Sequence, residues 1–286
     1  MSEIIARDLK FGMDDSIPSR WSPEQPEFSH VASAFMAALP YLEPYFIQNL
    51  REALPLIADK RITKDARAFI QQEARHAQQH RDWNQVLARR FPGFDKLERA
   101  IKTRLSHSRK KHSLPFRLAY TSGYEALTYQ IACFILEERH MLLQGADPRM
   151  VAMLAWHAAE EVEHKSVAFD VFQAVHGGYL LRVVGLGAAF VSSLRDIHAI
   201  MYFLMREDRL LQDAESRRRL RALRVRLVTK LVPEFRHYLR PRYHPSQHED
   251  PRIVSAWLAE HEEGHDLRRL SVELLEVLSG ARPRAA

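Results

Sequence analysis

Residues 69–80, FIQQEARHAQQH, and residues 156–172, WHAAEEVEHKSVAFDVF, decide the fold of this chain. Both stretches have the apolar periodicity of a helix, and each contains one Glu-x-x-His tetrad: Glu73 with His76, and Glu161 with His164. A spacing of three residues places a carboxylate and an imidazole on the same helix face, where both can reach one metal ion. The two tetrads therefore predict a metal centre built between helices.

Two isolated glutamates complete the ligand pattern. Glu43 is the only acid in the apolar stretch ALPYLEPYFIQNL, and Glu125 is the only acid in YTSGYEALTYQIACF. A bare carboxylate is costly to bury unless it is paired or bound. The alternatives are that Glu43 caps a turn beside Pro44 and that Glu125 pairs with an arginine. With both glutamates as ligands, the order is Glu, Glu-x-x-His, Glu, Glu-x-x-His, which holds two iron or manganese ions in some four-helix bundles.

Two further histidines share helix faces with the tetrads. His157 lies four residues before Glu161, and we treat it as a candidate seventh ligand. His80 lies four residues after His76 and is a candidate either to bind metal or to support a ligand. The alternative for each is a histidine that only forms hydrogen bonds in the core.

Glu160 and Tyr129 are candidate supporting residues. Glu160 lies four residues before His164 and can exchange roles with Glu161, although the tetrad spacing favours Glu161. Tyr129 lies four residues after Glu125 and is a candidate to line the site or to host a radical. A tyrosine packed in the core is the alternative for Tyr129.

A competing motif lies near the C-terminus. Residues 261–265, HEEGH, fit H-E-x-x-H, in which two histidines bind zinc and the glutamate activates water. Gly264 weakens the helix that this motif requires, and the surrounding stretch is polar. A five-residue match arises easily by chance in a chain with 15 histidines. We therefore expect no catalytic zinc site there.

The pattern of apolar residues predicts an all-α fold, because no strand-like alternation persists between turn signals. Asp147 and Pro148 predict a helix start, as N-cap and first helical residue. We expect one domain in three parts: an irregular lead-in over 1–28, a four-helix bundle over 29–178, and packed C-terminal helices over 179–286. The bundle helices are expected at 29–58, 63–90, 115–143 and 148–175, with a crossover helix at 95–113.

The chain's composition is that of a globular protein, with 46% apolar residues and one cysteine among 286 residues. A single cysteine, Cys133, cannot form a disulfide within the chain, so we expect a reducing, cytoplasmic setting. The first residues carry acids and no long apolar run, which is unlike a secretory signal.

The basic charge is concentrated in residues 206–246, which contain twelve Arg and Lys against five Asp and Glu. No nucleic-acid-binding motif accompanies them, so we expect no nucleic-acid partner. The preceding segment, 179–205, is apolar, but its longest uncharged run, 183–194, is shorter than the roughly 20 residues of a membrane-spanning helix. It is expected to pack on the bundle or on a second copy in a homodimer, with peripheral membrane contact as the alternative.

Three stretches give the chain a family resemblance: HRDWN at 80–84, WHAAEEVEHKSVAFDVFQAVHGGYLLRV at 156–183, and YLRPRYHP at 238–245. They resemble bacterial proteins described as predicted metal-dependent hydrolases, over residues 8–250. The ligand spacing is also similar to that of ferritin-like di-iron enzymes, particularly p-aminobenzoate N-oxygenases. In those enzymes a histidine four residues before the last tetrad adds a ligand, and His157 matches it. Because Gln72 and not an acid precedes Glu73, a partner for His76 must come from elsewhere.

The predicted function is that of a di-metal carboxylate enzyme. We expect two metal ions, with iron favoured over manganese or zinc. The main prediction is an oxidoreductase that activates oxygen to oxidise an apolar small-molecule substrate, with an electron donor as partner. The alternative is a hydrolase that uses a metal-bound hydroxide, as the resembled family's description implies. A third reading is a bundle that binds metal without catalysis.

Overall fold

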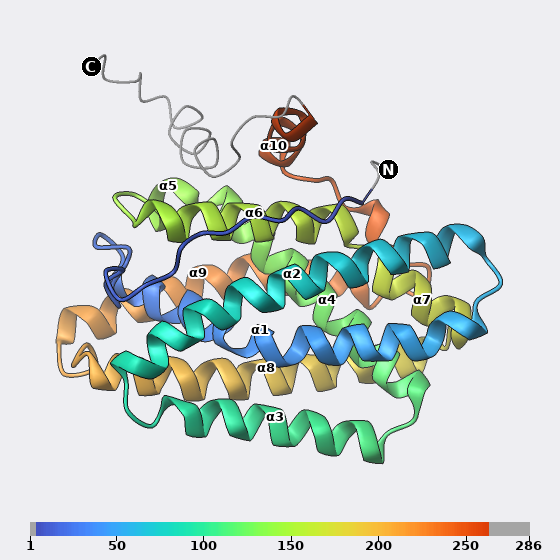
Figure 1. Cartoon of the computed structure of the whole chain (residues 1–286), viewed down its shortest axis with the longest axis horizontal. Helices are drawn as coiled ribbons and strands as arrows, with labels where there is room; N and C mark the ends of the chain where they lie inside the picture. The colour runs from blue at the N-terminus through green and yellow to red at the C-terminus, as the bar shows by residue number, and fades with distance from the viewer. Residues whose placement is uncertain (1–3, 263–286) are drawn as a thin grey trace.

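The computed structural model describes residues 4–262, and for residues 260–262 it describes the backbone alone. Figure 1 shows this part of the chain as helices joined by short connections, and no strand occurs within it. The α-helices are α1 Pro26–Ala53, α2 Lys60–Arg90, α3 Phe94–Lys111, α4 Leu114–Glu137, α5 Arg139–Leu142, α6 Pro148–His164, α7 Val167–Val175, α8 Tyr179–Glu207, α9 Ala214–Tyr238 and α10 Arg252–Glu262. Two short 3₁₀ turns, Leu54–Leu56 and Pro245–Gln247, complete the set. The predicted all-α class is confirmed.

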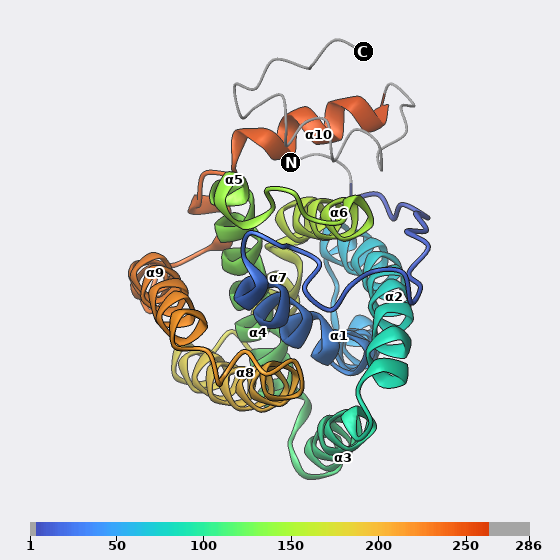
Figure 2. The same cartoon turned by 90° about the vertical axis from the view of Figure 1, so that its left-hand side faces the viewer.

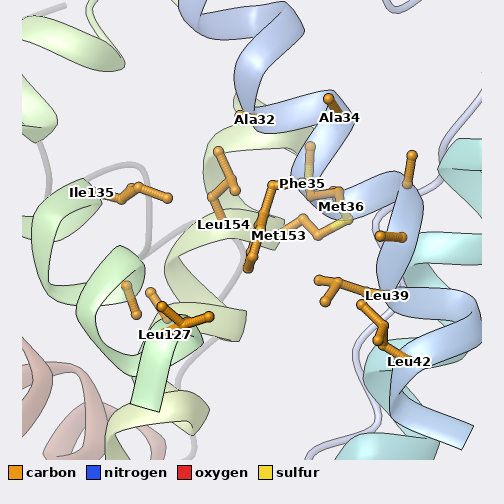
Figure 3. Packing of buried hydrophobic residues seen from close by; sticks show 14 of the residues in the cluster. Ala32, Ala34, Phe35, Met36, Leu39, Leu42, Leu127, Ile135, Met153 and Leu154 are labelled. Carbon is orange, nitrogen blue, oxygen red and sulfur yellow. The ribbon is translucent and has the colours of Figure 1, made fainter. Parts of the chain in front are cut away.

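The core lies between α1, α2, α4 and the pair α6 and α7. Helix α1 packs along α2, while α4 packs against both α6 and α7. Figure 2 shows these helices grouped around one interior, with α3 at the outside. In Figure 3, Met36 and Leu39 from α1 point toward Met153 of α6 and Leu127 of α4. All four side chains are at most 3% exposed, so apolar burial holds the helices in place.

Side-chain caps explain where two of the bundle helices begin. The Asp147 carboxylate accepts a hydrogen bond from the Arg149 amide, and Pro148 follows as the first helical residue. This confirms the predicted helix start. The Asp59 carboxylate caps α2 in the same way, with the amides of Arg61 and Ile62 as donors. Each cap satisfies amide groups that have no partner inside the helix.

The structure corrects several predicted helix bounds. The predicted helix 148–175 is two helices, since α6 ends at His164 and α7 begins at Val167. The predicted helix 115–143 is also divided, at Glu138, between α4 and α5. Neither break has a glycine or proline, the signals on which the predictions relied. The C-terminal helices predicted over 179–286 are described only as far as residue 262, and the HEEGH motif at 261–265 lies outside the described side chains.

Helix α8 is fixed to the bundle by a close crossing with α4. A β-carbon added to Gly185 would lie 2.4 Å from the carbonyl of Ala119, and one added to Gly123 would lie 2.6 Å from the α-carbon of Leu186. The two backbones can approach this closely only because both positions are glycine. Segment 179–205 therefore packs on the bundle through one face. No helix in the described part of the chain is long and apolar enough to cross a membrane.

Candidate metal centre

Eight side chains with metal-binding chemistry meet inside the bundle. Each is at most 4% exposed, and together they come from all four of the core helices α1, α2, α4 and α6: Glu43, Glu73, His76, His80, Glu125, His157, Glu161 and His164. Two groups among them have ligand atoms within 4.8 Å of one another. One consists of Glu73, His76, Glu161 and His164, hereafter the tetrad group, and the other of Glu43, His80 and His157, hereafter the trio.

The tetrad group joins the two Glu-x-x-His motifs. Oε1 of Glu73 lies 3.4 Å from Nδ1 of His76 on its own helix, and also 3.4 Å from Nε2 of His164 on α6. Nε2 of His164 lies 3.6 Å from Oε1 of Glu161. The three-residue spacing thus aims a carboxylate and an imidazole from each helix at one shared space.

The trio lies beside the tetrad group, and Glu161 contacts both. Oε1 of Glu161 lies 2.8 Å from Nε2 of His157, whose Nδ1 lies 3.0 Å from Nε2 of His80. Oε1 of Glu43 lies 3.9 Å from His80 and 4.0 Å from His157. His80 therefore offers a ligand atom to the trio, as Glu43 and His157 do.

The structure excludes the alternative roles considered for the two isolated glutamates. Glu43 lies well inside α1 and is buried, so it does not cap a turn beside Pro44. Glu125 is paired with a histidine and not an arginine, because its Oε2 lies 3.3 Å from Nδ1 of His164. Both carboxylates face the cluster, where the sequence predicted them.

Unpartnered polar atoms at the cluster fit a bound cation. Among the described residues, the buried side-chain atoms without a hydrogen-bond partner include both carboxylate oxygens of Glu43, both ring nitrogens of His164, Oε1 of Glu73, Nδ1 of His76 and Oε2 of Glu161. Buried polar atoms normally have a partner. Mixed carboxylate and imidazole donors suit divalent transition metals, and a cation would satisfy these atoms together.

Charges within the cluster shift its titrations strongly. Burial, together with the charges of Glu161 and Glu73, raises the pKa of Glu125 to about 8. Burial and the charge of Glu73 also raise the pKa of Glu43 well above its ordinary value. Burial opposes the charged form of His76, but the hydrogen bond to Glu160 and the nearby carboxylate of Glu73 raise its pKa to about 10. Several ligand candidates thus hold protons at neutral pH, in positions that a metal cation would take over.

His76 is held by a partner on another helix. Its Nε2 lies 2.9 Å from Oε2 of Glu160, which leaves Nδ1 facing the tetrad group. The other oxygen of Glu160 accepts a hydrogen bond of 3.0 Å from Arg7. Glu160 therefore supplies the carboxylate partner of His76. Gln72 does not take this role, because its amide donates to Glu163 and to the carbonyl of Ile5. A carboxylate in this place fixes the tautomer and the orientation of a ligand histidine.

Arg7 is a site residue that sequence reasoning missed. It lies in the irregular N-terminal segment, dark blue in Figure 1, which runs alongside α6. Its side chain is 3% exposed, and its guanidinium pairs with Glu160 and Glu163 and lies 5.2 Å from the ring centroid of Trp257 on α10. An arginine without helical periodicity around it gives no signal, because its partners are 153 and 156 residues away.

The structure does not bring Tyr129 to the cluster. The Tyr129 hydroxyl donates to Asp250 at 3.3 Å, and its ring lies 5.3 Å from Nζ of Lys165. Of the two roles considered for Tyr129, these contacts favour a tyrosine packed beside the chain that leads into α10 over one that lines the site.

The fold and the cluster define an all-helical protein with buried glutamate and histidine groups that can hold metal ions. A family model described as "Predicted metal-dependent hydrolase" matches residues 5–249, and the chain belongs to that family. The resemblance seen in residues 80–84 and 156–183 is thereby confirmed. No curated protein matches the chain. No solved structure matches it either. The similarity to ferritin-like di-iron enzymes stays a prediction.

Proposed function

We propose that this protein is a metal-dependent hydrolase whose active centre is formed by the tetrad group and the trio. The observation that carries the proposal is the place of Glu161, whose Oε1 faces His157 of the trio and His164 of the tetrad group. A carboxylate between two donor groups can hold two cations close together while reducing their repulsion. The family description supports hydrolysis over oxidation.

The chain's residues would bind the metal ions, orient the ligand side chains and exclude water from the centre. Glutamates and histidines from both groups would hold the ions, and a divalent ion there would polarise a carbonyl and lower the pKa of water. Glu160 keeps the Nε2 proton of His76 and directs Nδ1 toward the centre. The rings of Trp156 and Phe69 lie 4.7 and 4.8 Å from His76 and His164, so apolar surface surrounds the ligands. This lining favours an apolar ester or amide as substrate.

A second candidate function is oxygen activation by a di-iron centre. The observation that favours it is the contact between His157 and Glu161, at 2.8 Å, which places an extra imidazole next to the last tetrad. A buried site on helices with several carboxylates is also the setting of di-iron proteins. Iron and an electron donor belong to this candidate alone.

One set of preparations separates the two functions. The purified protein is stripped of metal and reloaded without oxygen with Zn²⁺, Mn²⁺ or Fe²⁺. The hydrolase proposal predicts cleavage of p-nitrophenyl esters by the zinc or manganese form, with the Glu161→Ala variant inactive. Substitution of the exposed His198 by alanine is the matched control and should change nothing. If only the iron form responds, with new near-ultraviolet absorption on exposure to oxygen and no ester cleavage, the second candidate replaces the first. Metal binding with neither response would indicate a bundle without catalysis.

A further inference from the structure

Large exposed apolar side chains gather on one side of the molecule. Of the thirteen in the part of the chain with described side chains, all but Ile5 and Leu56 lie on α8, on α9 or directly after α9. The most prominent are Leu180, Val184, Val191 and Leu194 on α8, and Val228 and Val232 on α9, each 44 to 77% exposed. We call this surface the α8/α9 face. A concentration of this kind marks an interaction surface, whereas scattered apolar residues do not.

Side-chain contacts join the two helices. They lie side by side in Figure 2, and the ring centroids of Phe190 on α8 and Phe235 on α9 are 5.7 Å apart. At one end of the pair, the Tyr179 hydroxyl donates to the carbonyl of Leu239. Because the opposite side of α8 is locked to α4 at Gly123 and Gly185, the outward side keeps a fixed orientation.

The charge on α9 identifies the partner. Residues 206–246 contain twelve basic and five acidic residues, and Arg221 and Arg236 on α9 are exposed. Other basic residues of α9 are paired within the molecule, Arg226 with Glu138 and Lys230 with Glu137. Among the acids, Glu215 is paired with Arg218 on the same helix. A second copy docked through this face would bring arginines against arginines, which opposes a symmetric dimer. An anionic lipid surface offers both phosphate groups for the arginines and an apolar boundary for the aliphatic side chains.

We propose that the α8/α9 face binds the surface of an anionic phospholipid bilayer. Val191, Leu194 and their neighbours enter the boundary between head groups and acyl chains, while the arginines of α9 contact lipid phosphates. The helices lie along the surface, since none of those described can span a bilayer. This inference is independent of the reaction that the metal centre catalyses.

Sedimentation with vesicles tests the proposal on the full-length protein. Vesicles of phosphatidylcholine mixed with phosphatidylglycerol in equal amounts should carry the protein down, and those of phosphatidylcholine alone should not. The double substitution Val191→Ser and Leu194→Ser should lower the binding constant by about tenfold or more, because it removes apolar groups that are buried at the membrane boundary. Exchanging Arg221 for alanine should lower it about fivefold, and added salt should weaken binding further.

Matched variants on another surface serve as controls. Leu56→Ser and Arg67→Ala change exposed residues outside the α8/α9 face and should bind vesicles like the unaltered protein. Circular dichroism and metal content should stay unchanged in every variant, because none of these positions contacts the metal centre. The proposal fails if the unaltered protein does not sediment with the anionic vesicles at low salt. It also fails if serine at positions 191 and 194 has no effect, or if analytical ultracentrifugation shows a dimer that these substitutions dissociate.

Discussion

The two ligand groups of the cluster differ in how they are held. In the tetrad group, each carboxylate lies beside imidazoles. Burial opposes the charged form of His164, but the negative charge of Glu161 outweighs it and raises the pKa of His164 well above its ordinary value. In the trio, burial and neighbouring histidines lower the pKa values of His80 and His157. Ion pairs between its own side chains therefore stabilise the tetrad group. The trio has no such pair, because it consists of two neutral imidazoles and the single carboxyl group of Glu43. The comparison indicates that the trio depends more on a cation for its order.

Removing Glu161 should have the largest effect, because its carboxylate contacts both groups. We expect Glu161→Ala to bind neither of the two ions at micromolar metal concentrations, as measured by inductively coupled plasma mass spectrometry after dialysis. Glu137→Ala, which removes a half-exposed carboxylate of α4, is the control and should keep the full metal content. A Glu161→Ala protein with unchanged stoichiometry would remove Glu161 from the ligand set.

Removing Glu43 should affect one group alone. Its carboxylate faces His80 and His157 and supplies the only acid of the trio. We expect Glu43→Ala to lose one ion of the two while the tetrad group keeps the other, which calorimetric titration with Zn²⁺ would resolve as the loss of one binding step. If both binding steps disappear together, the two groups do not bind metal independently, and the distinction drawn between them is wrong.

Neutralising Glu160 should weaken binding without removing a ligand. Glu160→Gln keeps the side chain's shape but replaces the carboxylate that orients His76. Changes at such partners typically cost about 10- to 100-fold in metal affinity. Titration against a chelator of known affinity would measure this loss, with the tetrad group affected and the trio spared. An affinity equal to that of the unaltered protein would show that His76 needs no partner.

Metal affinity should increase with pH. Glu125 has a pKa raised to about 8, so below that pH it holds a proton that the metal must displace. Affinity should therefore rise with pH, and the part of this rise that is due to Glu125, about tenfold per pH unit for its one proton, should end at about pH 8. The Glu125→Gln variant lacks this proton and should show a shallower dependence. A slope that is the same in both proteins would exclude Glu125 from the binding step.

The sequence predicted the part of the site that follows helical geometry. The three-residue spacing in each tetrad fixed which side chains share a face, and isolated acids in apolar stretches identified Glu43 and Glu125. Features that depend on tertiary contacts could not be read in the same way. Glu160 and Glu161 are adjacent, and only the packing of α2 against α6 shows which one supports His76. The break after His164 has no local breaker, and Arg7 is connected to the site by contacts alone.

The link between Arg7 and α6 also bears on how the chain is made. Arg7 is synthesised before its partner Glu160, which follows 153 residues later. The ligands Glu43, Glu73, His76 and His80 leave the ribosome while every α6 ligand is still missing. Since domains form from the N-terminus as synthesis proceeds, metal capture has to wait until His164 has emerged. Loading of the centre thus follows the synthesis of α6, and the contacts between the N-terminal segment and α6 can form only then.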